Sequence, residues 1–181
     1  MIDEQLIIAN TLEWVKVVVI GCNFCPFASK PVNEGKVRFT VNSNKSREAV
    51  LEQVIRECYR LDESDDIETS LLIIPEGYED FEDFLELLDM SEELLEDQDY
   101  EGIYQLASFH PQYLFAGSDE NDPANYTNRS PYPMLHFLRE SSVEKVLEFY
   151  KNPEKIPENN IRFAREKGLL FMQQLLKPGR S

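Results

Sequence analysis

The chain has 181 residues, of which 18 are Lys or Arg and 34 are Asp or Glu, so its formal net charge is −16 with both His neutral. This length suits one domain, and a hydrophobic content of 42% is enough to bury a substantial core. A charge this negative argues against nucleic acids and anionic membranes as partners, because attraction to phosphate needs clustered Lys and Arg. We therefore expect a single globular domain over residues 1–181 that binds neither nucleic acid nor membrane.

The negative charge is concentrated in one segment. Residues 57–101 hold 19 acidic residues and one basic residue, a net of −18, whereas residues 129–181 hold 10 bases and 6 acids, a net of +4. Solvated helix faces explain the acidic segment, and a surface for an unidentified basic protein partner is the alternative. The chain therefore stays compatible with a small anionic ligand outside that segment.

The amino terminus and the cysteines indicate an intracellular protein. Met1-Ile-Asp-Glu-Gln lacks the basic stretch of a signal peptide, and the apolar residues 15–20 are too few to cross a bilayer. We expect a cytoplasmic location. Cys22, Cys25 and Cys58 are an odd number in such a chain, which favours reduced thiols over a disulfide framework.

The first half of the chain alternates helical and strand patterns. Apolar residues recur every three or four positions over residues 3–20, which predicts a helix, although its β-branched end also suits a strand. Alternating or continuous apolar runs predict two strands, and amphipathic stretches predict two further helices. In chain order these are a strand at 36–41, a helix at 45–61 with a cap among residues 42–44, a strand at 70–74 and an acidic helix at 79–96.

The second half adds one strand and two long helices. The predicted elements are a strand at 103–109, an irregular stretch at 110–130, a helix from Pro131 to Tyr150 with Ser130 as its N-cap, and a last helix at 158–176. The order predicts an α/β or α+β fold, in which a β-α-β-α-β core forms a small sheet of roughly three or more strands. Further helices at both chain ends cover it. A ferredoxin-like α+β arrangement is the alternative.

Cys22 and Cys25 have the CxxC spacing of thioredoxin-like redox sites, in which a helix N-terminus lowers the pKa of the first thiol. Here the motif is followed by Pro26 and not by an amphipathic helix. Three interpretations stay open: a redox dithiol, Cys25 acting singly as a nucleophile or polar site residue, and buried thiols packed with Phe24 and Phe27.

The irregular stretch at 110–130 is longer than a plain connection and is predicted to carry function. Its short polar residues, among them Asp119 and Asn125, suit a hydrogen-bonded substrate site. His110 lies where the third strand ends, a favoured position for a catalytic group in an open sheet. We predict that His110 is an acid–base residue, and the alternative is a ring that bonds to nearby backbone.

Asn128, Arg129 and Ser130 come directly before the helix predicted at 131–150. The first turn of a helix binds anions through its free N–H groups and positive dipole end, and Arg129 adds a planar fork for carboxylate or phosphate. The three residues are therefore predicted to bind substrate. The alternative is an ordinary cap in which Arg129 pairs with Asp119 or Asp122.

His136 and Arg139 lie inside the same predicted helix. Arg139 falls within its apolar stripe and must meet an acceptor, either a carboxylate of the preceding loop or a ligand, because an unpaired buried charge is prohibitive. His136 lies one turn earlier at the edge of this stripe. We predict that Arg129, His136 and Arg139 converge on one anion, with a structural clamp as the alternative role of Arg139.

Metal binding is a competing chemistry. His110, His136, Asp119, Asp122 and Cys25 offer suitable atoms, but they form no compact ligand motif, and nearby arginines would oppose a cation. The seven glycines form no phosphate loop of the Walker or Rossmann type. We predict no metal site and leave the cofactor open.

Several short motifs together resemble one family. They are Cys25-Pro-Phe-Ala28, His110-Pro111, Asn128-Arg-Ser-Pro-Tyr-Pro133 and Leu135-His-Phe-Leu-Arg-Glu140. In combination they resemble the uncharacterised bacterial family known as domain of unknown function 1415, over nearly the whole chain. That family commonly has an aliphatic residue at the place of Cys22, which argues against the dithiol. The resemblance implies signature positions but assigns them no role: Cys25, His110, Asn128, Arg129, His136 and Arg139.

The leading hypothesis is an enzyme that acts on a small anionic metabolite. In it Arg129 and Arg139 hold a carboxylate or phosphate, His110 is the general base or acid, and Cys25 or His136 assists, since a histidine exchanges protons near neutral pH. A non-catalytic ligand-binding or interaction protein is the second hypothesis. A metal or redox protein is the third.

Overall fold

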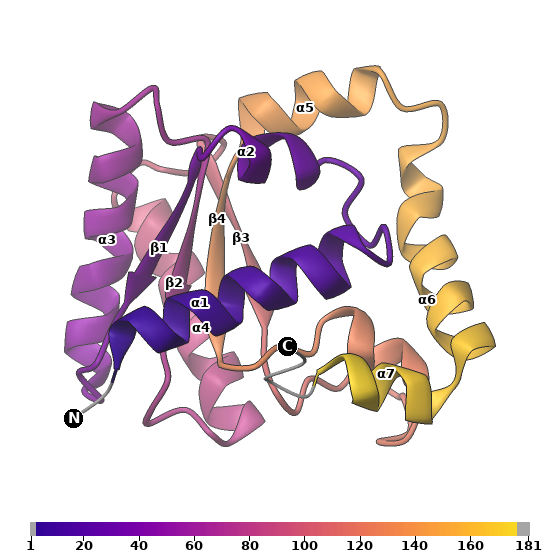
Figure 1. The fold of residues 1–181 in the computed structure, drawn as a ribbon. Helices are drawn as coiled ribbons and strands as arrows, with labels where there is room; N and C mark the ends of the chain where they lie inside the picture. Colours follow the sequence, from indigo (N-terminus) through magenta and orange to yellow (C-terminus); the bar gives the residue numbers. More distant parts are fainter. Residues whose placement is uncertain (1–2, 177–181) are drawn as a thin grey trace.

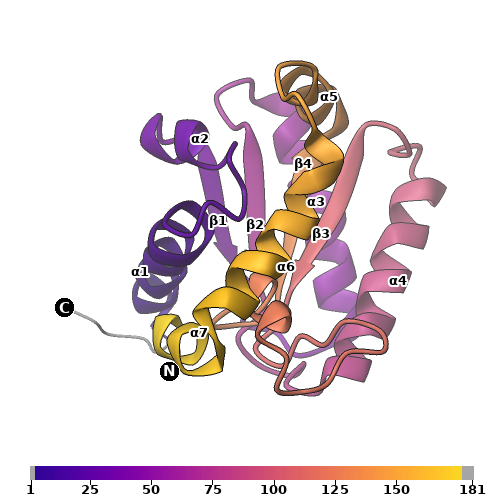
Figure 2. The same ribbon diagram turned by 90° about the vertical axis from the view of Figure 1, so that its right-hand side faces the viewer.

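The computed structural model describes residues 3–176, and Figures 1 and 2 show a four-stranded sheet with helices on both of its faces. The first half of the chain supplies α1 (Glu4–Trp14), the π-helix η1 (Val15–Ile20), α2 (Ser29–Asn33), β1 (Val37–Val41), α3 (Arg47–Glu63), β2 (Thr69–Ile73) and α4 (Phe81–Asp97). The second half supplies β3 (Tyr104–Phe109), the 3-10 helix η2 (Pro123–Thr127), β4 (Met134–Arg139), α5 (Glu140–Glu148), the 3-10 helix η3 (Pro153–Lys155), α6 (Ile156–Lys167) and α7 (Leu169–Leu175). No helix within residues 3–176 is long and apolar enough to span a lipid bilayer.

Three α-helices begin at an Asp or Ser whose side chain accepts a backbone N–H of the first turn. Asp3 caps α1, Ser46 caps α3 and Asp80 caps α4. Each cap satisfies an N–H group that the first helical turn leaves free. The cap of α3 therefore lies after the predicted residues 42–44, whose Asn side chains hold the turn that leads to Ser46.

The strands lie in the order β1-β2-β4-β3. β1 and β2 are parallel and joined through α3, and β4 lies antiparallel between β2 and β3. β1, β2 and β3 thus run in one direction, as strands joined by helical crossovers do. The sheet confirms the predicted β-α-β-α-β core with helices at both chain ends, and β4 is an additional strand. The ferredoxin-like alternative, with its β-α-β-β-α-β order, does not match.

The predicted helix from Pro131 to Tyr150 is wrong, because residues 134–139 form the strand β4 and only residues 140–148 form a helix. The spacing of apolar residues distinguishes a helix from a strand, but a short and nearly continuous apolar run shows no such spacing and suits either element. Helices lie on both faces of this sheet, and a nearly continuous apolar run suits a strand in its interior. Ser130 therefore lies in a loop and is not the N-cap of a helix.

Two other predicted helices differ in detail. The segment at 158–176 is divided into α6 and α7 by Gly168, whose φ of +82° suits glycine and ends the first helix. The segment at 3–20 is helical as predicted, but its β-branched end winds as the π-helix η1. A π-helix is uncommon and holds an extra residue in its turn.

The helices α3 and α4 cover one face of the sheet, which we call the sealed face. Leu135 and Phe137 of β4 point to this face, and neither side chain has any exposed surface. From the helices, Val50, Val54, Phe84 and Leu87 pack against them. Figure 2 shows α4 on the side of the sheet opposite α1. This face carries a closed hydrophobic core.

The other face, which we call the open face, is covered less completely. α1 packs against β1, whereas α6 makes its main contacts with η2, η3 and α7. In Figure 1, α1 crosses in front of the strands and α6 stands to the right of them. Every residue of β1 is only half-buried, as are most residues of β3, while β2 is buried throughout. The helices therefore leave part of this face accessible.

Candidate functional site

The open patch consists of Gln105, Ala107, His136 and Leu138, four neighbouring side chains on the open face. Ala107 pairs with His136 and Gln105 pairs with Leu138, so β3 and β4 present them together. Gln105 is exposed and the other three are half-buried. Side chains alternate across a strand, so Leu135 and Phe137 of β4 are fully buried on the sealed face, whereas His136 and Leu138 are half-buried on the open face, next to the fully buried Met134. A central strand with this contrast marks a candidate site.

His136 is the one titratable residue of the open patch. Its Nε2 lies 2.6 Å from Oγ1 of Thr69, the first residue of β2. The Thr69 hydroxyl in turn donates to the backbone oxygen of Phe137. The ring also lies near Phe109, with a centroid distance of 6.2 Å. One nitrogen of His136 is therefore fixed by the sheet.

The other ring nitrogen, Nδ1, has no hydrogen-bond partner among residues 3–176. Within the same residues, every fully buried side-chain nitrogen or oxygen does have a partner. Nδ1 must therefore reach solvent. A nitrogen lone pair on a fixed imidazole, accessible from an open face, can accept a hydrogen bond or a proton from a ligand.

The environment keeps His136 neutral. Burial lowers its pKa from the ordinary value of 6.5 to about 4. At neutral pH the ring is therefore the uncharged base. The imidazole is half-buried by its exposed surface but lies deep in the protein, in the middle of the sheet, which explains both its access and its low pKa.

His110 has a different environment. Its ring is fully buried between Phe81 and Phe84. Nε2 lies 2.9 Å from the backbone oxygen of Tyr78, and Nδ1 accepts the N–H of Gln112 at 3.0 Å. Burial lowers the pKa of His110. Both nitrogens are occupied, so this geometry favours the alternative of a ring bonded to nearby backbone over an acid–base role.

Arg139 points to the sealed face and holds the carboxyl end of α3. It donates to the backbone oxygens of Leu61, Ser64 and Ile67, and to the Tyr104 hydroxyl. A cation there also compensates the negative end of the helix dipole. The prediction that Arg139 needs an acceptor is confirmed. The acceptors are backbone oxygens at and after the end of α3, and not carboxylates of the loop at 110–130.

Arg129 lies in the loop before β4 and holds that loop together. Its Nε donates to the backbone oxygen of Tyr113, an outer nitrogen donates to that of Glu120, and the guanidinium covers the Tyr126 ring at 4.5 Å. The alternative in which Arg129 pairs with Asp119 or Asp122 is wrong, because Arg129 donates to backbone oxygens and Asp122 pairs with Arg165.

The predicted convergence of Arg129, His136 and Arg139 is also wrong. Arg129 precedes the start of β4 and Arg139 is its last residue. The six-residue strand between them spans about 17 Å. His136 and Arg139 are three positions apart in a strand, which places them on opposite faces. No single small anion meets all three.

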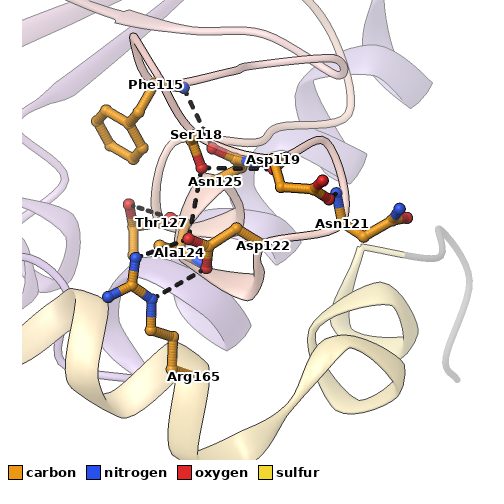
Figure 3. A network of polar contacts seen from close by, with 9 residues as sticks. All are labelled: Phe115, Ser118, Asp119, Asn121, Asp122, Ala124, Asn125, Thr127 and Arg165. Atoms are coloured by element: carbon orange, nitrogen blue, oxygen red, sulfur yellow. Dashed lines mark hydrogen bonds and ion pairs between the residues drawn. The ribbon is translucent and has the colours of Figure 1, made fainter.

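Figure 3 shows the polar network that orders the loop at 110–130. Asn125 is fully buried, accepts the N–H of Phe115 and donates to the backbone oxygen of Asp119. Asp122 forms a bidentate ion pair with Arg165 of α6. The Arg165 nitrogens lie 2.7 and 3.1 Å from the two carboxylate oxygens. Arg165 holds the pKa of Asp122 down at about 2. The loop is thus ordered and tied to α6.

The remaining loop candidates also bond within the loop. The Asp119 carboxylate accepts the N–H of Asn121. Asn128 accepts the Thr127 hydroxyl and donates weakly to Ser108, and the Ser130 hydroxyl donates to the backbone oxygen of Tyr132. These contacts support the loop and do not gather the polar groups at the open patch.

Cys22 and Cys25 are free thiols in the turn after η1. Burial raises the pKa of both, although Lys167 partly counters it at Cys22 and two backbone N–H groups do so at Cys25. A reactive cysteine needs a stabilised thiolate, so this environment does not favour the redox interpretation. Cys22 borders an open surface hollow of about 390 Å³, whose other wall is α6 with Asn159, Asn160, Arg162, Phe163 and Glu166.

Metal ligands do not gather in the part of the chain that the structure describes, where no cluster of three or more His, Cys, Asp or Glu side chains is suited to a metal ion. Sequence reasoning missed Thr69, the partner of His136, because a threonine at the start of a strand gives no distinctive signal. It also missed Glu57, which is fully buried and accepts from Gln53, Arg60 and Ser70.

Comparison with known families decides the relationship of this chain. A family model described as "Protein of unknown function (DUF1415)" matches residues 6–174. The chain belongs to that family. The match spans all four strands and both His, and it confirms the resemblance drawn from the short motifs. Comparisons with curated proteins and with solved structures gave no match. The DUF1415 description names no reaction, so function rests on the site itself.

Proposed function

We propose that this protein is an enzyme that binds a small anionic metabolite at the open patch and uses His136 as its acid–base residue. The observation that carries the proposal is the accessible, unpartnered Nδ1 of an imidazole whose other nitrogen is held by Thr69. A base oriented by a hydrogen bond on its far side is the arrangement that proton-transfer sites require.

The charge distribution supports an anion as the ligand. Residues 3–41, which include α1 and β1, hold four bases and four acids, and residues 129–176 hold eight bases and six acids, a net of +2. The acidic residues 57–101 include α4, which covers the sealed face. A ligand approaching the open face thus meets the less negative side of the protein.

The low pKa of His136 fits an anionic ligand as well. A carboxylate or phosphate bound beside the ring raises the pKa of the imidazole from about 4 toward the neutral range. General catalysis is most effective when the pKa of the base lies near the working pH. Binding of the anion would therefore improve His136 as a base. Proton transfer of this kind contributes roughly 10² to 10⁴ in rate.

His110, Arg129 and Arg139 have no part in this proposed reaction. Both nitrogens of His110 bond within the protein. Arg129 and Arg139 direct their hydrogen bonds to backbone oxygens and a tyrosine hydroxyl. We assign these three residues to the support of the loop and of α3, and Cys25 to the turn after η1.

A ligand screen tests the proposal. A panel of carboxylate and phosphate metabolites is added to the wild type, His136→Gln and the matched control His110→Gln, and the rise in Tm is measured. At least one anion should raise the Tm of the wild type and of His110→Gln but not that of His136→Gln. Absence of any shift across the panel would overturn the proposal.

Nuclear magnetic resonance (NMR) of the wild type serves as a second readout, in case His110→Gln does not fold. The chain has only two histidines, so their ring signals are separately assignable. A bound metabolite should move the His136 signals and leave those of His110 in place. If the protein is an enzyme, the wild type should convert that metabolite over time and His136→Gln should not. Binding without conversion would favour the non-catalytic alternative.

A further inference from the structure

The Thr69 hydroxyl determines which nitrogen of His136 carries the proton. A hydroxyl has one proton to donate, and the backbone oxygen of Phe137, at 2.5 Å from Oγ1, can only accept. The Thr69 proton is therefore committed to Phe137. The contact of 2.6 Å between Oγ1 and Nε2 then requires that Nε2 is the donor.

This chain of hydrogen bonds leaves Nδ1 as a bare acceptor. A neutral imidazole has one N–H, and His136 uses it toward Thr69. Nδ1 has no partner among residues 3–176 and reaches solvent. Thr69 lies beside His136 on the open face, since it pairs with Leu138, the next residue of β4 on that face.

We propose that Thr69 is a positioning residue that fixes His136 as a hydrogen-bond acceptor, so that the ligand group at Nδ1 is a donor: a hydroxyl, a thiol or an N–H. This inference rests on the proposed function and specifies its ligand class. A carboxylate or phosphate oxygen at Nδ1 would place two lone pairs against each other. The anionic part of the ligand therefore lies beside the ring without direct contact to Nδ1, where it still raises the pKa of the imidazole.

The ligand class has a chemical consequence. An X–H group whose proton points at Nδ1 is ready to transfer that proton to the ring, which leaves the electron pair on X and makes His136 an imidazolium. The new charge is shared toward Thr69 through Nε2–H. The Phe109 ring beside His136 adds an apolar wall, which suits a flat or apolar ligand body next to the donor group.

The first experiment measures the tautomer in the absence of any ligand. NMR of protein labelled with ¹⁵N-histidine distinguishes protonated from bare ring nitrogens in the wild type, Thr69→Val and the conservative Thr69→Ser. The wild type and Thr69→Ser should show His136 protonated at Nε2 alone, and Thr69→Val should show a mixture of both tautomers.

His110 is the internal control for this measurement. Its Nδ1 accepts from Gln112, so it also carries the proton on Nε2, and its signals should be the same in all three proteins if the fold is intact. Wild-type His136 protonated at Nδ1, or a spectrum unchanged in Thr69→Val, would overturn the role of Thr69.

The second experiment tests the ligand class with three probes of similar shape: phenol, which has a donor; anisole, which has none; and benzoate, which is an anion. Phenol should shift the His136 Nδ1 signal several-fold more than anisole or benzoate. An equal or larger shift with anisole or benzoate, or no shift with phenol, would overturn the inference. The screen of metabolite anions can succeed or fail independently of this result, so the two failures are distinguishable.

Discussion

The sealed and open faces of one sheet differ in how completely their polar groups are satisfied. On the sealed face, Glu57 accepts hydrogen bonds from three side chains, and Asp62 accepts both the Tyr100 and Tyr104 hydroxyls. On the open face, His136 has one fixed nitrogen and one that is accessible. Buried polar groups are normally paired, and an accessible unpaired one on a rigid strand is available for a ligand.

The two histidines differ in the same way. His110 is enclosed by aromatic rings next to α4 and uses both nitrogens for structure, whereas His136 uses one. Residue type and family motif alone therefore do not separate a structural histidine from a candidate base. The two kinds of histidine are separated by the number of ring nitrogens without a partner and by how completely the helices cover that face of the sheet.

The largest effect is expected on the sealed face, from Arg139→Met. The substitution removes the guanidinium donor from three backbone oxygens at and just after the end of α3, and we expect a loss of about 3 kcal/mol in the free energy of unfolding. Urea denaturation measures it. Arg139→Lys keeps the charge at the helix end and should recover part of the loss. A wild-type stability in Arg139→Met would contradict the structural role.

The next effect comes from the open face and depends on pH. The unfolded chain protonates His136 near its ordinary pKa of 6.5 and the folded chain only near about 4, so acid favours the unfolded state. Between pH 7 and pH 5 this linkage costs up to about 2 kcal/mol of stability. His136→Gln should lose less stability than the wild type over this range, measured by urea denaturation at both pH values. Equal losses in the two proteins would disprove the low pKa.

A smaller effect is expected in the loop that leads into β4. Arg129→Met removes two hydrogen bonds to loop backbone and the contact with the Tyr126 ring, which should cost about 1 kcal/mol. Hydrogen exchange should become faster across residues 110–130. The rise in Tm caused by a ligand at the open patch should persist in Arg129→Met. Loss of that rise would indicate that Arg129 takes part in ligand binding.

Much of the fold follows from the sequence because its elements have clear periods. The strands near residues 36–41 and 70–74 and the helices between them were predicted within a few residues, since alternation and amphipathic spacing directly reflect which face is buried. The strand β4 is not predicted, because Met134 to Leu138 is apolar apart from His136 and suits a helix equally well.

The site was predictable only in part, for the same reason. His136 was a candidate from its sequence neighbourhood, but the error over β4 placed it beside Arg139 on one helix face. In the strand, the two residues point to opposite faces of the sheet. Thr69 is 67 residues away from His136, and only the pairing of β2 with β4 brings the two together. A contact of that kind leaves no local pattern.

His136 is accessible at one ring nitrogen and His110 at none. Brief treatment of the folded protein with diethyl pyrocarbonate near neutral pH, followed by peptide mass spectrometry, compares their reaction rates directly. We expect His136 to be modified at least roughly ten-fold faster than His110, which should react only when the protein opens. A His110 that reacts as fast as His136, or a His136 that reacts only after unfolding, would contradict the assignment of the open patch as the functional site.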